Sequence, residues 1–456
     1  MIRAFFFGEV GGPVGKNNQQ RRKTKAKSRK QRPQSGPGRG GSAAEQDGLS
    51  GLPIEGRARY AVLTILQETA REELDWVDAA SHLEGQSSDE GWPAALARTF
   101  GELGDDTVAH AWQQGWMPRE VVSAFRKSLS AEAVRAAKTM MRGQLARYPE
   151  AQLSDRWRAH REELVDQTEF EDIAAAVRGL GRWDRIVLWA GALEAFPMFS
   201  TIPSIPKVEP LPGSPVVAHG FKGAESSKIY TKIQALLAKA EATGSDAEAE
   251  AFTAKAQQLI ARHSVNEALL SQTGHGKREP DALRVIIERP YEMPKSELLA
   301  QIASANHCRP VYWPDGGFTT LIGDRDDLRS VELLYNSLLV QATATMTRAG
   351  SVSSKAGRSQ TRSFRQSFLA SFAGRIGERL RASAGDTTRE VAEETGTDLV
   401  PVMRQRDERV DARTEELFPN LKYGRGTRIT NYEGHVAGLA AADAARLTAG
   451  EPITPS

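Results

Sequence analysis

The sequence predicts an α+β protein that is mostly helical, with an N-terminal helical bundle, a helical hairpin and a C-terminal α+β module that contains a small, partly antiparallel sheet. Apolar residues recur at helical spacing before residue 270, and the runs typical of strands all follow residue 281. Residues 314–317 (Pro-Asp-Gly-Gly) give a strong hairpin turn signal between two such runs. Because strands joined by a short hairpin are antiparallel, at least part of the sheet must be antiparallel.

The chain has 456 residues, which is more than one ordinary domain, so several parts are expected. The boundaries predicted from composition and periodicity are a disordered basic arm at 1–50, an all-helical domain at 55–196, a Pro-rich linker at 197–222, a helical hairpin at 223–272 and an α+β module at 281–450.

The arm is rich in Gly, Pro, Gln, Ser and Lys/Arg. Such a composition cannot bury enough apolar surface to offset the entropy lost on ordering, so we expect disorder. The linker holds six prolines within residues 197–222, which favours a stiff, extended spacer.

Seven of the eight tryptophans fall in the all-helical domain, where large aromatic residues in helical stripes usually form the core. Pro118 follows a short turn and suits the first turn of the next helix. The junction could be a DNA-reading helix-turn-helix, since Arg119, Arg126 and Lys127 follow it. Helical bundles use such turns widely, so packing is the favoured interpretation.

Residues 228–270 read as two helices. Apolar residues recur at helical spacing in the first, and Gly244 is expected to end it. Ser245 and Glu248 have the spacing of a capping box that starts the second helix. The alanine-rich second helix leaves little side chain between the backbones, so the two helices should pack closely.

This hairpin resembles domain-of-unknown-function family 2786 (DUF2786), which occurs in bacterial and phage proteins. The resemblance rests on the lysine, leucine and alanine-glutamate pattern of Lys232–Glu241, Ala247–Ala251 and Ala256–Ile260. It implies that a mixed α/β module follows the hairpin, and it implies no activity.

The C-terminal module should run β-α-β-β-α-α-β-α. The expected strands are Leu283–Glu288, Pro310–Trp313, Phe318–Ile322 and Leu399–Met403. Ser296 is expected to cap the helix after the first strand, and Asp326 to cap a helix that runs to Arg348. Further helices are expected at Arg362–Arg381 and Glu433–Arg446. In the last of these, Gly434, Gly438 and Ala442 leave room for another backbone.

Charge is unevenly distributed along the chain. Residues 1–45 hold eleven Lys/Arg and two Glu, and residues 348–382 hold eight Lys/Arg and one Glu, whereas the whole chain carries only +2. A flexible basic arm and a basic helix are able to neutralise phosphates, so we expect a non-enzymatic, nucleic-acid-associated protein. The residues expected to bind nucleic acid are Arg21, Arg22, Lys23, Lys25, Lys27, Arg29, Lys30, Arg358, Arg362, Arg365, Arg375 and Arg379.

The helix at 362–381 has two interpretations. Phe364, Phe368 and Phe372 recur every four residues among the arginines and could stack on bases. Alternatively, the phenylalanines form the core and the arginines reach outward at its edge, which is the favoured interpretation.

Two further functions stay open. One is a protein-interaction module that docks through the hairpin and the tryptophan-rich bundle. The less favoured one is a metal-dependent or thiol enzyme that uses Asp324, His435 or Cys308. No catalytic motif or His-Glu-x-x-His zinc pattern occurs, so we expect no cofactor or metal. The lone Cys308 excludes an internal disulfide framework. No run of eighteen apolar residues or signal peptide is evident, so we expect a cytoplasmic protein with no membrane partner.

Overall fold

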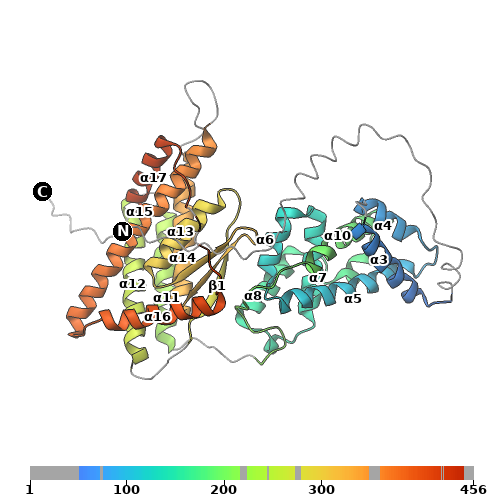
Figure 1. Cartoon of the computed structure of the whole chain (residues 1–456), viewed down its shortest axis with the longest axis horizontal. Helices are drawn as coiled ribbons and strands as arrows, with labels where there is room; N and C mark the ends of the chain where they lie inside the picture. Colours follow the sequence, from blue (N-terminus) through green and yellow to red (C-terminus); the bar gives the residue numbers. More distant parts are fainter. Residues whose placement is uncertain are drawn as a thin grey trace. The chain divides into compact units, whose positions relative to one another are not determined.

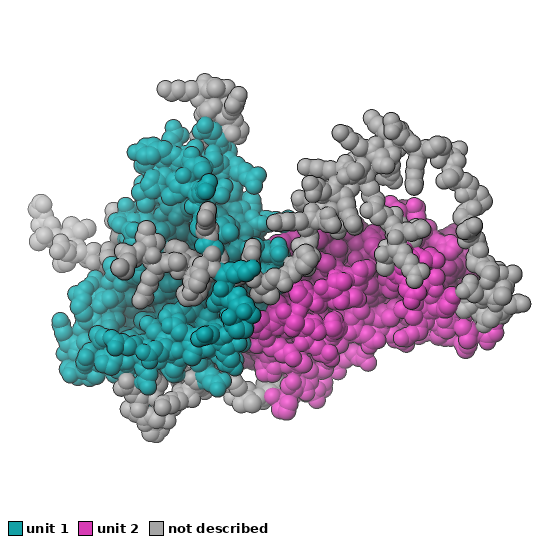
Figure 2. Space-filling view, viewed as in Figure 1, with its two compact units in different colours: residues 1–10, 218–456 teal, residues 11–217 magenta. Residues whose placement is uncertain are grey.

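The computed structural model describes residues 51–71, 75–215, 223–243, 246–272, 279–348, 360–422, 424 and 426–445. The described residues up to 215 form one compact unit, and those from 223 onward form a second (Figure 2). The predicted fold class is confirmed, because helices dominate both units and a small sheet occurs only in the second. No described helix is long and apolar enough to cross a membrane.

The N-terminal unit is helical throughout. Its helices are α3 (Ile54–Arg71), α4 (Trp76–Gly85), α5 (Trp92–Gln113), α6 (Pro118–Ser128), α7 (Ala131–Ala146), α8 (Asp155–Gln167), α9 (Ile173–Val177) and α10 (Arg182–Ser200). Four of these helices begin with an N-cap residue whose side-chain oxygen accepts a hydrogen bond from a backbone N–H group of the first turn. The N-cap residues are Asp75, Ser130, Ser154 and Asp172. Pro118 occupies the first turn of α6, as its position in the sequence predicts.

Most tryptophans of this unit belong to its core, as predicted. Trp112, Trp157 and Trp189 are buried, and their indole N–H groups donate to Gln144, to the carbonyl of Pro210 and to Glu84, respectively. Trp183 differs, because 64% of it is exposed. The unit is therefore held by buried aromatic rings whose polar atoms are satisfied.

The Pro-rich segment lies along the N-terminal unit as far as it is described. Helix α10 continues through Pro197 to Ser200. After it, the backbone N–H of Ile205 donates to the Gln114 carbonyl, and the N–H of Gly213 donates to the Gln152 carbonyl. Residues 201–215 therefore pack on the helices they follow.

The hairpin consists of α11 (Gly223–Ala242) and α12 (Asp246–Gln272). Ile233 and Leu237 of α11 and Ile260 of α12 are buried in the main core cluster of the C-terminal unit. The predicted helix end at Gly244 and cap at Ser245 lie outside the described residues. Tyr230 anchors α11 to α14 (Arg325–Arg348), because its hydroxyl contacts Ser330 at 3.2 Å.

The sheet has three antiparallel strands in the order β1 (Asp281–Ile286), β3 (Phe318–Gly323) and β2 (Arg309–Trp313). Leu283 pairs with Leu321, and Val311 pairs with Thr320. Every residue of the central strand β3 is buried. Antiparallel pairing around the 314–317 turn is as predicted, although β1 begins two residues before the expected start.

Two predicted helix caps are wrong. Helix α13 (Glu292–Ala305) begins before Ser296, whose hydroxyl instead lies 3.2 Å from the Thr319 hydroxyl of β3. Asp326 lies in the first turn of α14, and the carbonyl of Asp324 accepts the N–H of Leu328. The helix starts four residues before Ser296 in the first case and one residue before Asp326 in the second.

The predicted strand Leu399–Met403 is also wrong. These residues start helix α16 (Val400–Leu417), which follows α15 (Thr361–Thr395) after a left-handed Gly396 with φ 62°. Leu399, Val402 and Met403 have helical spacing and are buried together. Pro401 suits the first turn of a helix and cannot donate to a sheet.

The last helix, α17 (Tyr432–Ala444), lies beside α15 and runs parallel to it (Figure 1). A Cβ added at Gly434 would lie 2.3 Å from the carbonyl oxygen of Phe364, and one at Gly438 would lie 2.3 Å from that of Phe368. The predicted close packing at these two glycines is therefore confirmed.

Candidate functional site

The phenylalanines of α15 belong to the core. Phe364, Phe368 and Phe372 are buried, and neighbouring rings stack with centroids 6.3 Å apart. Rings that are buried in the protein are not available to stack on bases. The part of the favoured interpretation that places the phenylalanines in the core is confirmed, and base stacking on these three rings is excluded.

Two arginines in the middle of α15, Arg375 and Arg379, are engaged within the unit. Arg375 pairs with Asp443 of α17 at 2.6 Å and with Glu378 at 3.0 Å, and its hydrogen bonds to these carboxylates raise the pKa of Arg375. Arg379 donates to three backbone carbonyls at the end of α17, those of Ala442, Asp443 and Ala445. Arg379 therefore caps the negative end of the α17 dipole.

The N-terminal arginines of α15 differ from these. Arg362 is exposed and Arg365 is partly buried, and neither guanidinium makes a hydrogen bond or ion pair with any residue in the described ranges. The stretch from residue 333 to 377 contains no Asp or Glu. The start of α15 and the adjoining end of α14 therefore present positive charge without a carboxylate of their own.

The remaining predicted binding residues lie outside the described part of the chain. These residues are Arg21, Arg22, Lys23, Lys25, Lys27, Arg29, Lys30 and Arg358. In the sequence, Arg358 lies four residues before Arg362.

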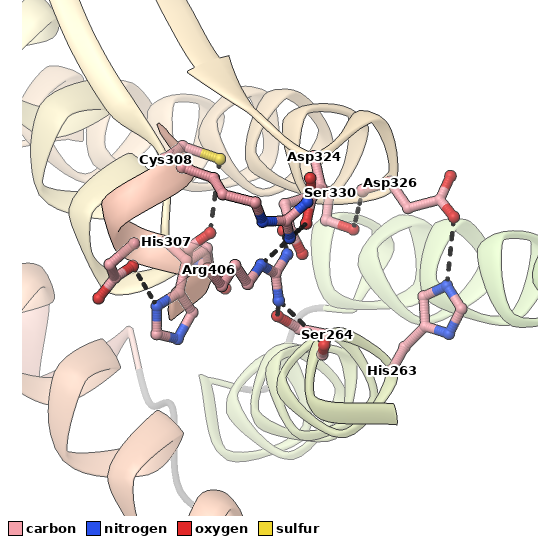
Figure 3. Close-up of polar contacts among 12 residues, drawn as sticks. His263, Ser264, His307, Cys308, Asp324, Asp326, Ser330 and Arg406 are labelled. Atoms are coloured by element: carbon pink, nitrogen blue, oxygen red, sulfur yellow. Dashed lines mark hydrogen bonds and ion pairs between the residues drawn. The ribbon is translucent and has the colours of Figure 1, made fainter. Parts of the chain in front are cut away.

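A polar cluster that the sequence does not reveal centres on Arg406 of α16 (Figure 3). Arg406 is almost fully buried, and its Nη1 donates to the carbonyl and hydroxyl of Ser264 on α12 at 2.9 and 2.6 Å. Its Nε lies 3.0 Å from Asp324, and its other terminal nitrogen pairs with the buried Asp327. One guanidinium therefore joins α12, α14 and α16.

Two further pairs extend this contact along α16. His307 Nδ1 lies 3.0 Å from Asp407, and Arg309 pairs with Asp411 at 2.5 Å. Hydrogen bonding to His307 and nearby positive charge keep the pKa of Asp407 low although burial opposes this. His307 has a left-handed backbone (φ 58°) directly after α13, a position that usually holds glycine.

The residues proposed for enzyme chemistry have separate surroundings. Asp324 contacts Arg406, whereas His435 of α17 lies 2.7 Å from the Ser371 hydroxyl of α15. Cys308 is fully buried, and burial raises the pKa of its thiol to about 12. Within the described ranges, no group of three or more His, Cys, Asp or Glu side chains is arranged to hold a metal ion.

Glu297 is a second buried charge that sequence reasoning missed. It lies on α13 with 8% exposure, and one of its carboxylate oxygens accepts the backbone N–H of Thr427. Burial raises the pKa of Glu297, and the hydrogen bond from Thr427 only partly offsets this. This bond fixes the segment before α17 onto α13.

We expect Glu297→Gln to keep or raise stability at pH 7, by up to about 1 kcal/mol, because the amide oxygen still accepts the Thr427 N–H and no buried charge remains. Because the pKa of Glu297 is higher in the folded protein than in the unfolded chain, the wild type loses stability as the pH rises from the unfolded-state pKa to the folded-state pKa. The gain should therefore vanish below the unfolded pKa, about 4.3. Urea unfolding between pH 4 and 8 measures this, and a Gln variant that is destabilised at pH 7 would contradict it.

Glu297→Ala, which leaves the N–H of Thr427 without an acceptor, should lower the free energy of unfolding by about 1–3 kcal/mol.

The comparison with protein families supports the resemblance seen in the sequence. The family described as protein of unknown function (DUF2786) matches residues 228–267, which cover most of α11 and the larger part of α12. An α+β module follows the hairpin, as the resemblance implies. Neither a search of curated proteins nor a search of solved structures found a match.

Proposed function

We propose that the protein binds nucleic acid through its phosphate backbone, using the start of α15 together with the basic N-terminal arm. The main support for the proposal is that the arginines of α15 differ in whether they contact other residues of the protein. Arg375 and Arg379 are held by α17, whereas Arg362 and Arg365 have no partner in the described part of the chain. Guanidinium groups without protein partners are free to neutralise phosphates and release counterions.

The proposed nucleic-acid-binding surface is smaller than the one predicted from the sequence. Arg375 and Arg379 are assigned to the packing of α17, so Arg362, Arg365, Arg358 and the arm residues at 21–30 remain as binding residues. Because Phe364, Phe368 and Phe372 are buried, these three rings of α15 are not available for stacking beside its arginines. Binding should therefore show little sequence preference. No chemical reaction is part of the proposal.

A salt titration tests the proposal, with random-sequence DNA or RNA and fluorescence anisotropy as the readout. The logarithm of the binding constant should fall linearly with the logarithm of salt concentration, and Arg362→Ala with Arg365→Ala should reduce the slope by about 2. Arg389→Ala is the matched control, because Arg389 is an exposed arginine on the same helix that pairs with Asp386. Deleting residues 1–45 separates the contribution of the arm.

Two results would oppose the proposal. One is an affinity that salt does not change. The other is a double variant that binds as the wild type does in both the full chain and the chain without its arm.

A protein-interaction module is the second candidate function. Tyr432 is 79% exposed and Val436 is 45% exposed one turn later on α17, and Ile429 just before the helix is also exposed. Gly434, between them, faces α15, so the two side chains lie on the outer face of α17. A pull-down whose captured proteins persist after nuclease treatment would favour this function over the first.

A further inference from the structure

The starts of α15 and α17 are joined by hydrogen bonds. Asn431, the N-cap residue of α17, donates from its Nδ2 to the Oε1 of Gln360, the N-cap residue of α15, at 3.3 Å. The hydroxyl of Ser367, which is fully buried, accepts the backbone N–H groups of Thr430 and Asn431 at 3.1 and 3.0 Å. The backbone that leads into α17 is therefore fixed against the first turns of α15, the part of the helix that carries Arg362.

This fixed backbone carries a strongly exposed aromatic side chain. Tyr432 is the first residue of α17 and is 79% exposed, the highest value among the large hydrophobic side chains of the described residues. A tyrosine has a planar ring and only two side-chain torsions to order, so it supplies contact area at a low cost in entropy. Tyr432 therefore offers a face for stacking, which the buried phenylalanines of α15 do not.

The sequence around this ring is basic. Arg428 is exposed, and it makes no hydrogen bond or ion pair with any residue that the structure describes. Residues 417–432 contain no Asp or Glu, and the same is true of residues 333–377, which include the start of α15. Glu433 follows Tyr432, but a step of about 100° around the helix turns its side chain away from that of Tyr432. Two basic stretches without carboxylates therefore meet where α17 begins.

We propose that Tyr432 and the cations near it form a binding site for single-stranded nucleic acid. An unpaired base stacks on the exposed ring, and the guanidinium groups of Arg362 and Arg428 neutralise phosphates of the same strand. A duplex offers only phosphates to this surface, because its bases are stacked on one another. This preference for unpaired strands rests on the proposed nucleic-acid binding and makes it more specific.

Three DNA probes test the site with the full-length protein: a short strand of mixed sequence, the matching duplex, and an abasic strand of the same length and charge. Tyr432→Ala should weaken binding to the mixed-sequence strand at least about fivefold, because stacking on the ring is lost. The affinities for the duplex and the abasic strand should stay within about twofold, since neither offers an unstacked base. Tyr432→Phe, which keeps the ring, should bind all three probes as the wild type does.

Tyr60→Ala is the matched control, because Tyr60 is 44% exposed but the nearby Arg57 and Arg59 are paired with carboxylates. This variant should not change binding to any probe. Salt titrations separate charge from stacking. Arg428→Ala should reduce the salt slope for the mixed-sequence strand by about 0.7, whereas Tyr432→Ala should leave the slope unchanged, because the ring carries no charge.

The results distinguish failure of the stacking site from failure of nucleic-acid binding as a whole. The stacking site is overturned if Tyr432→Ala binds the mixed-sequence strand as the wild type does, or if it loses equal affinity for all three probes. Phosphate binding through Arg362 and Arg365 would stand in either case. If none of the probes binds, both proposals are overturned. A Tyr432→Ala variant that keeps its affinity for all three probes but loses a nuclease-resistant protein partner would assign the ring to protein docking instead.

Discussion

Replacing Arg406 with methionine should destabilise the C-terminal unit by about 3–5 kcal/mol, the range found when one partner of a buried ion pair is removed. The methionine retains the apolar stem but leaves Asp327, which is 3% exposed, without its cation. It also leaves the Ser264 carbonyl without the donor it has in the wild type. Urea unfolding at neutral pH, followed by circular dichroism, gives the change in the free energy of unfolding.

Two comparisons distinguish this mechanism from a general loss of packing. Arg409→Met should cost less than about 1 kcal/mol, because Arg409 is 30% exposed and its contact to Asp324 is long. Adding Asp327→Asn to Arg406→Met should recover part of the loss, since the orphaned charge is then absent. An effect below about 1 kcal/mol would show that water satisfies Asp327 and that α16 docks without this pair.

The Arg406 cluster is a part of the structure that could not be predicted from the local sequence. Arg406 is separated from Ser264 by 142 residues, and no motif links the two positions. Asp324 and Asp327 are visible as an acidic group after a strand, but the sequence favours capping of the next helix by this group, with metal binding as the less favoured explanation. Only the docking of α16 shows that their partner is an arginine. The same applies to Glu297, whose partner is a backbone N–H 130 residues away.

Periodicity, by contrast, predicted the class and order of most elements. Helices of 24 and 35 residues carry long apolar repeats, and the 314–317 turn fixed the antiparallel pair. The error at residues 399–403 arose from a short apolar run, for which periodicity does not separate a strand from the first turn of a helix. Pro401 was the available signal, because a proline inside a strand argues against that assignment.

The arginines of α15 were predicted as one group, and the structure separates them. A turn of 100° per residue places Arg365, Arg375 and Arg379 on one half of the helix, but it does not show which neighbour lies there. Helix α17 runs beside the first half of α15, from Phe364 to Arg379, and its C-terminal end supplies Asp443 and the terminal carbonyls. The parallel helix α17, 63–70 residues later in the sequence, determines which arginines of α15 make contacts within the unit. The sequence of α15 alone does not indicate which ones these are.

Gly438→Ala should destabilise the C-terminal unit by about 2–3 kcal/mol, although alanine is the better helix former. A Cβ at this position would lie 2.3 Å from the carbonyl oxygen of Phe368 and 3.0 Å from its Cα. These atoms are backbone, so no side chain is able to move aside, and α17 must shift away from α15. That shift would also disturb the contact between Arg379 and the end of α17. Thermal and urea unfolding measure the loss.

Gly385→Ala is the matched control, because Gly385 lies inside α15 with nothing within 4 Å of the added Cβ. Here alanine should stabilise the protein by up to about 1 kcal/mol, so the two glycine-to-alanine changes are expected to have opposite signs. Gly434→Ala should behave as Gly438→Ala does, since its Cβ meets the Phe364 carbonyl at the same 2.3 Å. Equal stabilisation by all three substitutions would mean that α17 does not pack on α15 through its glycines, and the internal role assigned to Arg375 and Arg379 would then lose its basis.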